Sequence, residues 1–173
     1  MKILYIFSIA FAVIFSYFLG SLNSSIIVVR LWKKVDIRDF GSKNAGLTNT
    51  LRVFGKGPAL ATLLCDLAKG VIAVSVSRLF ASAIGSFDDT MIIGYIAGAF
   101  AMVGHIFPVY YNFKGGKAVL VAATTLLAID PVTFSIVIPF FALILLVTRY
   151  VSVSSIIAAV AYPIFTFITQ SLR

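Results

Sequence analysis

The chain has 173 residues, of which 61% are hydrophobic and only 12% are charged, and its mean hydropathy is +1.07. Soluble domains are usually about 45–50% apolar and about a quarter charged, so this balance excludes an ordinary water-soluble domain and indicates an integral membrane protein. The formal net charge is +8, because 14 Lys and Arg residues outnumber 6 acidic residues, all of them Asp. Most of these cations lie in short loops between apolar segments. We therefore interpret them as a topology signal and an attraction for anionic substrates or membrane lipids, and reject nucleic-acid binding.

The first apolar segment extends from Ile3 to Trp32. It is longer than the core of a cleaved signal peptide, which has about 7 to 15 residues, and Lys33 and Lys34 follow it, so we expect a retained membrane helix. The second half of this helix is unusually polar, because it contains Gly20, Ser21, Asn23, Ser24 and Ser25. Small and polar residues favour close helix packing; a helix end that faces a functional site is the alternative interpretation.

A basic connection, residues 33–57, follows the first helix, and the positive-inside rule places it on the cytoplasmic side. Within it, Phe40–Arg52 has the sequence FGSKNAGLTNTLR. Its glycines allow backbone N–H groups to converge, its Ser, Thr and Asn side chains add donors, and Arg52 supplies a planar fork that suits a phosphate. We interpret this segment as an anion site; a polar connecting loop that caps the next helix is the alternative.

The second apolar segment extends from about Pro58 to Ala83 and carries Asp66 and Lys69. Residues three apart lie on one helix face, and charges inside a membrane are costly, so we expect these two to pair or to face a polar cavity. Either arrangement makes them candidates for a functional site, with a purely structural ion pair as the alternative. The single cysteine, Cys65, cannot form an internal disulfide and is expected to be an inert core residue.

The connection from Gly85 to Thr90 contains Asp88 and Asp89 and no cation, which indicates the outer side of the membrane. The third helix is expected from about Met91 to Val109, with His105 near its inner end. A lone His in an apolar segment is more often a structural group than a catalyst.

The segment that follows the third helix changes this balance. Lys114–Lys117 has the sequence KGGK and precedes the next apolar segment. Two glycines between two lysines present backbone donors beside two cations, just before a helix N-terminus, and this arrangement predicts a second anion site. An ordinary short basic loop on the inner face is the alternative.

Three further helices are expected, over about Ala118–Ile129, Val132–Thr148 and Val151–Gln170, the first of them short. The sequence therefore predicts an all-α, polytopic membrane helix bundle with six spans and a single membrane-embedded domain over residues 1–173. On this topology the Phe40–Arg52 and KGGK segments and the inner ends of the second and third helices meet at the cytoplasmic face. We infer an inward-facing pocket for one or more phosphate groups.

Three motifs carry a resemblance to a known family. They are GSKNAGLTNTLR at Gly41–Arg52, DLAKG at Asp66–Gly70 and GHIFPVYYNFKGGK at Gly104–Lys117. Their order and spacing together are specific, and they resemble the bacterial acyl phosphate:glycerol-3-phosphate acyltransferases, the PlsY family. The resemblance implies transfer of a fatty acyl group from acyl phosphate to the 1-hydroxyl of sn-glycerol 3-phosphate. The products would be lysophosphatidate and phosphate, in the first step of membrane phospholipid synthesis.

The resemblance also implies roles for individual residues. The expected catalytic residues are Ser42, Arg52, His105 and Lys117. The expected substrate-binding residues are Gly41, Asn44, Gly46, Thr48, Asn49, Asp66, Lys69, Gly70, Lys114, Gly115 and Gly116. The phosphate of glycerol 3-phosphate is the expected general base and His105 is the alternative base.

The expected setting also follows from the resemblance. The family uses neither a metal nor coenzyme A, so no cofactor is expected. The expected location is the bacterial cytoplasmic membrane with the active site facing the cytoplasm. The expected partners are the two substrates, membrane lipids and the enzyme that supplies acyl phosphate.

Family members continue through a seventh helix into a basic tail, whereas this sequence ends at Arg173 after the sixth expected helix. We therefore expect this last helix and tail to be lacking, and an inactive truncated homologue or a non-catalytic assembly protein is one alternative. A carrier or channel for phosphate-containing anions is another, because basic loops and intramembrane charges also occur along transport paths. Polar groups that gather at one face favour the enzyme over the transporter.

Overall fold

The computed structural model describes residues 2–85 and 90–171, and no strand occurs in those residues. Its α-helices are α1 (Lys2–Ser21), α2 (Ser24–Lys33), α3 (Leu47–Phe54), α4 (Lys56–Ala83), α5 (Met91–Ile106), α6 (Val119–Ile129), α7 (Pro131–Thr148) and α8 (Val151–Ser171). They fall into two compact units, one up to Ile129 and one from Asp130, so the single domain over residues 1–173 stays a prediction. The expected outer turn with Asp88 and Asp89 lies outside the described residues.

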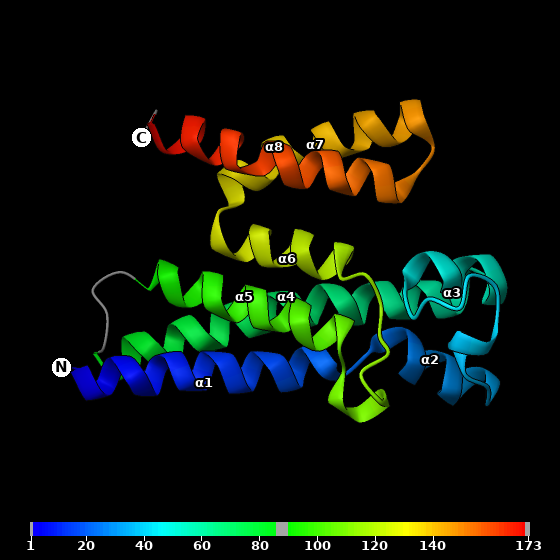
Figure 1. Ribbon diagram of the computed structural model, residues 1–173, viewed down its shortest axis with the longest axis horizontal. Coiled ribbons are helices and arrows are strands. Elements are labelled where there is room, and N and C mark those ends of the chain that lie inside the picture. The colour runs from blue at the N-terminus through cyan, green and yellow to red at the C-terminus, as the bar shows by residue number, and fades with distance from the viewer. Residues whose placement is uncertain (1, 86–89, 172–173) are drawn as a thin grey trace. The chain divides into compact units, whose positions relative to one another are not determined.

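In the first unit α1, α4 and α5 pack as three long helices, with α6 against α4 and α5 (Figure 1). Small residues allow this close approach. A Cβ atom on Gly20 of α1 would collide with the carbonyl group of Ala101 on α5, and one on Gly104 of α5 would collide with the carbonyl oxygen of Tyr17 on α1. Without a strong hydrophobic force between helices in lipid, such close backbone packing is a main source of helix association.

Five segments of the described chain are long and apolar enough to cross a membrane: Ile3–Lys33, Lys56–Ala83, Met91–Tyr111, Pro131–Thr148 and Val151–Ser171. The fourth expected span, Ala118–Ile129, corresponds to α6, which has 11 residues and is short, as predicted. It is shorter than the roughly 20 residues that a straight helix needs to cross a bilayer. The described residues thus form the predicted all-α membrane helix bundle, with five segments of spanning length where six were expected.

The first span differs from the expected continuous helix over Ile3–Trp32, because it is interrupted between α1 and α2. Asn23 has an extended backbone, and its side-chain Oδ1 accepts a hydrogen bond from the N–H group of Ile26. It therefore acts as the N-cap of a new helix that begins at Ser24. The polar second half of the segment contained this capping signal, and it produces a break rather than only a packing surface.

The basic connection 33–57 also contains more helix than expected. It has a short 3₁₀ turn, η1 (Ile37–Asp39), and then α3, so the second half of the Phe40–Arg52 segment is helical. α3 starts after Gly46, whose carbonyl accepts hydrogen bonds from the N–H groups of Asn49 and Thr50. Before α3, Ala45 is buried with Ile26, Val29 and Ile37, and this small cluster fixes the segment against α2.

Cys65 is exposed on the surface of α4, so the prediction of a core residue is wrong. The neighbouring Leu64 and Leu60 are each 56% exposed. In a membrane protein the lipid-facing surface is as apolar as the interior, so an apolar context does not identify the core.

The second unit is a helical hairpin in which α7 and α8 pack side by side (Figure 1). Asp130 caps α7, because its side chain accepts hydrogen bonds from the N–H groups of Val132 and Thr133. The hydroxyl groups of Thr133 and Thr169 join the two helices at 2.7 Å. Arg149, with φ of +60°, ends α7 and turns the chain towards α8.

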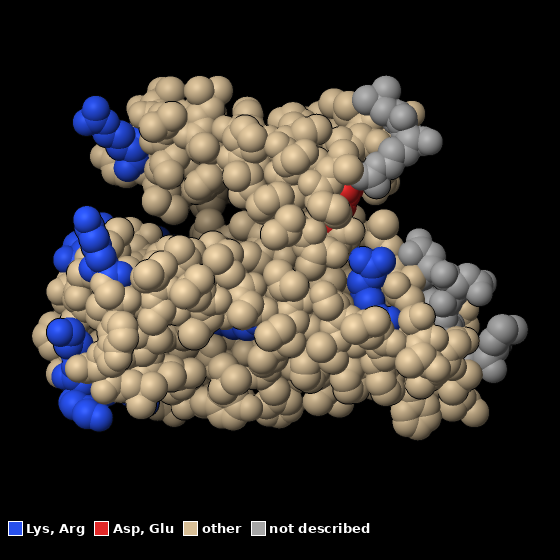
Figure 2. Space-filling view, turned by 180° about the vertical axis from the view of Figure 1, so that it is seen from behind, with Lys and Arg blue, Asp and Glu red and all other residues tan. Residues whose placement is uncertain are grey.

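Cations gather at one end of the first unit, the end with α2, α3 and the KGGK segment, as Figure 2 shows for one face. The exposed members of this group are Arg30, Lys33, Lys34, Lys43, Arg52, Lys56, Lys114 and Lys117. Large apolar side chains are exposed along the remaining helices, as expected for a surface in contact with lipid. The first unit therefore has one charged end and an apolar body.

Candidate functional site

A buried polar cluster lies where α2, α4 and α5 meet. The ammonium group of Lys69 lies 2.8 Å from Oδ1 of Asp66, one turn earlier on α4. The same Lys69 Nζ lies 2.9 Å from Nδ1 of His105, near the end of α5. Ser24, at the start of α2, donates a hydrogen bond of 2.7 Å to Oδ1 of Asp66. Asp66, Lys69 and His105 are at most 5% exposed, so these interactions occur away from water.

The break between α1 and α2 makes this cluster possible. Lys69 Nζ also donates to the backbone carbonyl of Leu22, at 3.1 Å, and Leu22 lies in the break. A carbonyl at a helix end has no intrahelical partner, so it is available as an acceptor. The three N–H bonds of Lys69 are therefore matched by Asp66, His105 and Leu22, which satisfies a buried ammonium group completely.

These contacts also define the tautomer of His105. The Lys69 ammonium group can only donate, so the ring nitrogen Nδ1 must accept, and in the neutral ring the proton then lies on Nε2. The Nε2–H edge faces the KGGK segment, because a Cβ atom on Gly116 would collide with Nε2. His105 is thus held as a hydrogen-bond donor that points towards this segment.

The KGGK segment is hydrogen-bonded to the end of α5. The N–H group of Gly115 donates to the carbonyl of Ile106, and that of Gly116 donates to the carbonyl of His105, both at 3.1 Å. The expectation that these glycines present free backbone donors to an anion is therefore wrong, because α5 already uses both N–H groups. Glycine is required at both positions because neighbouring atoms approach too closely to leave room for a Cβ atom. Lys114 and Lys117, on either side, are exposed.

The first motif is organised by Asn49 of α3. Its Oδ1 accepts from the N–H group of Ser42 at 3.0 Å, and its Nδ2 donates to the carbonyl of Phe40 at 3.0 Å. Gly41, between these two residues, has φ of +58°, and a Cβ atom there would collide with Oδ1 of Asn49. Asn49 is 1% exposed, so it is a buried brace that shapes the turn and leaves the side chain of Ser42 on the surface.

Ala45 connects the first motif with the other parts of the site. Its carbonyl accepts a 3.2 Å hydrogen bond from Nδ2 of Asn23, the residue that caps α2. A Cβ atom on Gly116 would collide with the same carbonyl. The first motif, the helix break and the KGGK segment therefore meet beside His105.

Comparisons with known proteins agree with this assembly. The model of one family, described as "Glycerol-3-phosphate acyltransferase", matches residues 10–172. The chain belongs to the glycerol-3-phosphate acyltransferase family. The resemblance seen in the three motifs is thereby confirmed.

Individual relatives of this family member cover most of its length. A glycerol-3-phosphate acyltransferase of Chlorobaculum parvum is 47% identical over 161 residues, which are 91% of this chain and 69% of the relative. One from Chlorobaculum tepidum is 46% identical over 162 residues, with 91% and 70% covered.

Two solved structures are also similar. Both are crystal structures of PlsY, an integral membrane glycerol 3-phosphate acyltransferase. The glycerol 3-phosphate form matches with a TM-score of 0.79 and 34% identity, over 94% of this chain and 78% of the other. The lysophosphatidic acid form matches with a TM-score of 0.77 and 32% identity, over 94% and 77%. The integral membrane fold predicted from the sequence is thus confirmed.

Several site residues predicted for this acyltransferase-family chain lie apart from the buried cluster. Among the described residues, the side chains of Ser42, Asn44, Thr48, Arg52 and Lys117 make no hydrogen bond, ion pair or ring contact. Gly70 packs on α6, where a Cβ atom would collide with the hydroxyl of Thr124. In the same described part of the chain, no group of three or more His, Cys, Asp or Glu side chains is placed to hold a metal ion.

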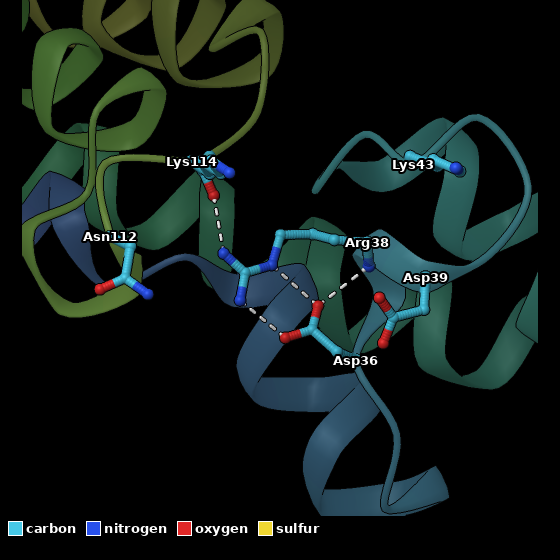
Figure 3. Close-up of a pocket in the computed structure, with 7 residues that line it drawn as sticks. Asp36, Arg38, Asp39, Lys43, Asn112 and Lys114 are labelled. Carbon is cyan, nitrogen blue, oxygen red and sulfur yellow. Dashed lines mark hydrogen bonds and ion pairs between the residues drawn. The ribbon is translucent and has the colours of Figure 1, made fainter.

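Sequence reasoning missed a further polar group beside the KGGK segment. A pocket of about 440 Å³ is lined by Asp36, Arg38, Asp39, Lys43, Asn112, Lys114 and Gly115 (Figure 3). Arg38 hydrogen-bonds Asp36 and, with Arg30, holds the pKa of that carboxyl group well below its ordinary value. The same carboxylate raises the pKa of Arg38.

Proposed function

We propose that this chain transfers a fatty acyl group from acyl phosphate to the 1-hydroxyl of sn-glycerol 3-phosphate, at the cytoplasmic face of a bacterial membrane. The observation that carries the proposal is the buried Asp66–Lys69–His105 cluster. It lies where the helix break and the KGGK segment meet, and Ala45 of the first motif contacts both of them. Family membership supports the reaction class, and the homologous PlsY structures in glycerol 3-phosphate and lysophosphatidic acid forms support the acceptor and product.

The reaction needs no covalent intermediate on the protein. In our proposal the 1-hydroxyl oxygen attacks the carbonyl carbon of acyl phosphate, a new C–O ester bond forms, and the C–O bond to the phosphate breaks. The hydroxyl proton passes to a phosphate oxygen, and inorganic phosphate leaves. Because acyl phosphate is already activated, the protein has to bring two anionic substrates together and stabilise developing charge.

Three exposed groups are suited to holding these phosphates. Arg52 and Lys117 are cations without a partner among the described residues, and the hydroxyl of Ser42 is likewise unengaged. A guanidinium fork, an ammonium group and a hydroxyl are common partners of phosphate oxygens. We assign the two substrate phosphates to these residues, with Asn49 shaping the turn that carries Ser42.

His105 is better suited to donate than to accept a proton in this arrangement. Its Nδ1 is occupied by Lys69, and Nε2 carries the proton, so neither nitrogen is a free base. We therefore keep the phosphate of glycerol 3-phosphate as the base and assign His105 Nε2–H to the oxygen that gains negative charge. Asp66 and Ser24 serve this role indirectly, because they fix Lys69 and hence the imidazole.

The charged end of the first unit supports the assigned location. Its exposed cations lie at the end of the first span, in the basic connection 33–57 and in the KGGK segment, and such an excess of cations is typical of the cytoplasmic side. The same charge favours anionic, water-soluble substrates from that side, and the enzyme that supplies acyl phosphate is the expected partner.

The test is acyl transfer by the purified chain in liposomes, given acyl phosphate and radiolabelled glycerol 3-phosphate. We expect labelled lysophosphatidate from the wild type and at least about a 100-fold lower rate from Arg52→Ala and Lys117→Ala, as for loss of a charge-stabilising group. Lys33→Ala removes an exposed cation outside the motifs and is the matched control, which should keep its activity.

Label that accumulates inside the liposomes without conversion would favour the anion carrier. Full activity in both the Arg52 and Lys117 variants would overturn the site assignment. Failure of the wild type, with a homologous enzyme active in the same preparation, would favour the non-catalytic alternatives.

A further inference from the structure

Arg38 makes an unusual number of contacts for a residue outside the assigned site. Its guanidinium group binds Asp36 through two parallel hydrogen bonds, from Nε at 2.9 Å and from Nη2 at 2.8 Å. Its Nη1 donates to two backbone carbonyls, that of Tyr111 at 2.9 Å and that of Lys114 at 3.2 Å. Its side chain is 22% exposed, so the group is largely shielded from water.

These contacts connect two distant parts of the chain. Tyr111 and Lys114 lie 73 and 76 residues after Arg38 in the sequence, in the turn that leads directly into Gly115 and Gly116. The far side of this turn is fixed by the hydrogen bonds from the two glycines to the end of α5. Arg38 supplies the hydrogen bonds on the near side, as Figure 3 shows for Lys114.

The fork geometry explains why an arginine occupies this position. Asp36 engages one edge of the planar group, and this leaves Nη1 directed at the carbonyls. A lysine has one nitrogen and cannot reach a carboxylate bidentately while it also donates to two separate carbonyls in this geometry. Asp36 is held in turn by the N–H group of Arg38 at 2.9 Å and by Arg30 at 2.6 Å.

We propose that Arg38 is a positioning residue that fixes the KGGK segment at a set distance from the first motif. It does not touch substrate. It holds the turn that precedes Gly116, which contacts His105, and Lys117. It therefore sets the spacing between Lys117 and the phosphate-binding residues of the first motif. This inference rests on the proposed function for its effect on rate, but its structural part stands independently.

The first experiment measures the structural part alone. Hydrogen exchange of the peptide covering residues 108–118 is followed by mass spectrometry in Arg38→Ala, Arg38→Lys and Arg30→Ala. Arg30 is the matched control, because it also binds Asp36 and lies over the Tyr111 ring at 5.4 Å but contacts neither carbonyl. We expect faster exchange in both Arg38 variants and wild-type exchange in Arg30→Ala.

The second experiment measures steady-state acyl transfer in the same variants. We expect kcat to fall by about 10- to 100-fold in Arg38→Ala and in Arg38→Lys, as for a displaced catalytic geometry, with the thermal midpoint kept within a few degrees. Arg30→Ala should stay within about twofold of wild type, the size expected for an exposed ion pair.

The outcomes separate the two claims. Unchanged exchange in both Arg38 variants would overturn the positioning role, whatever the activity. Faster exchange in the Arg38 variants, together with a wild type that shows no acyl transfer, would retain the positioning role and reject the proposed function. Full rescue of kcat by Arg38→Lys would also overturn the inference, because charge alone would then suffice.

Discussion

Replacing Lys69 by Met removes the centre of the buried cluster and tests whether it is held together by charge. The change leaves the Asp66 carboxylate, which is 2% exposed, with the hydroxyl of Ser24 as its hydrogen-bond donor. Removing one partner of a buried ion pair costs about 3 to 5 kcal/mol, because the other charge stays buried and unpaired. We expect Lys69→Met to lower the free energy of unfolding by this amount.

The double variant Lys69→Met, Asp66→Asn distinguishes charge from packing. It removes both charges, and the introduced amide can still accept from Ser24, so the combined loss should be smaller than the sum of the two single losses by about 1 to 3 kcal/mol. Unfolding is followed by far-UV circular dichroism in mixtures of a mild detergent and dodecyl sulfate. Lys56→Met, at the exposed start of α4, is the control and should change stability by less than about 0.5 kcal/mol. Additive single losses would refute a coupled buried pair.

The loop geometry leads to three further predictions. Gly116→Ala should reduce acyl transfer by about 10- to 100-fold, measured as kcat, because the added methyl group collides with His105 Nε2 and displaces the segment. Asn49→Ala should lower the free energy of unfolding by about 1 to 3 kcal/mol and expose the Ser42 turn to proteolysis, because buried polar partners are left unpaired. Asp36 has a folded-state pKa below its ordinary value of 3.8, so its ionised form stabilises the folded state. This stabilisation is complete above about pH 4 and is lost as pH falls further. It is measured as the change in the unfolding midpoint from about pH 5 to pH 2.5.

Each of these has a control and a contrary outcome. Gly57→Ala adds a methyl group that meets Trp32 at an ordinary 3.4 Å, and equal activity of the two alanine variants would reject the steric argument. Asn44→Ala should leave stability nearly unchanged, and an equal loss there would reject the brace role of Asn49. Asp36→Asn should lack the acid-side decrease, and an identical pH profile would show that this carboxylate is not responsible.

The sequence predicted well those features that depend on residues close together in the chain. Apart from the break in the first span, the ends of the long helices were predicted to within about three residues, because hydrophobic runs bounded by Lys, Gly and Pro identify membrane helices directly. The pairing of Asp66 with Lys69 also follows from local spacing on one helix face. The partnership with His105 does not, since it depends on how closely α4 and α5 pack.

The missed features depend on backbone groups or on competing local signals. Asn23 interrupts the first span because an N-cap competes with continued helix, and within an apolar run it resembles a packing residue. Arg38 was not singled out because two of its partners are backbone carbonyls far away in the sequence, and carbonyls carry no residue signature. The expectation of free backbone donors at Gly115 and Gly116 was wrong for the same reason, because the acceptors of their N–H groups are also backbone carbonyls.

The most direct measurement of the central claim is the stoichiometry of the reaction catalysed by the purified chain. Acyl phosphate and glycerol 3-phosphate are supplied, and lysophosphatidate and inorganic phosphate are quantified together over the initial phase. Our account predicts equal molar amounts of the two products, with neither formed when glycerol 3-phosphate is omitted. Phosphate release without lysophosphatidate would indicate hydrolysis instead of acyl transfer, and would contradict the proposed function.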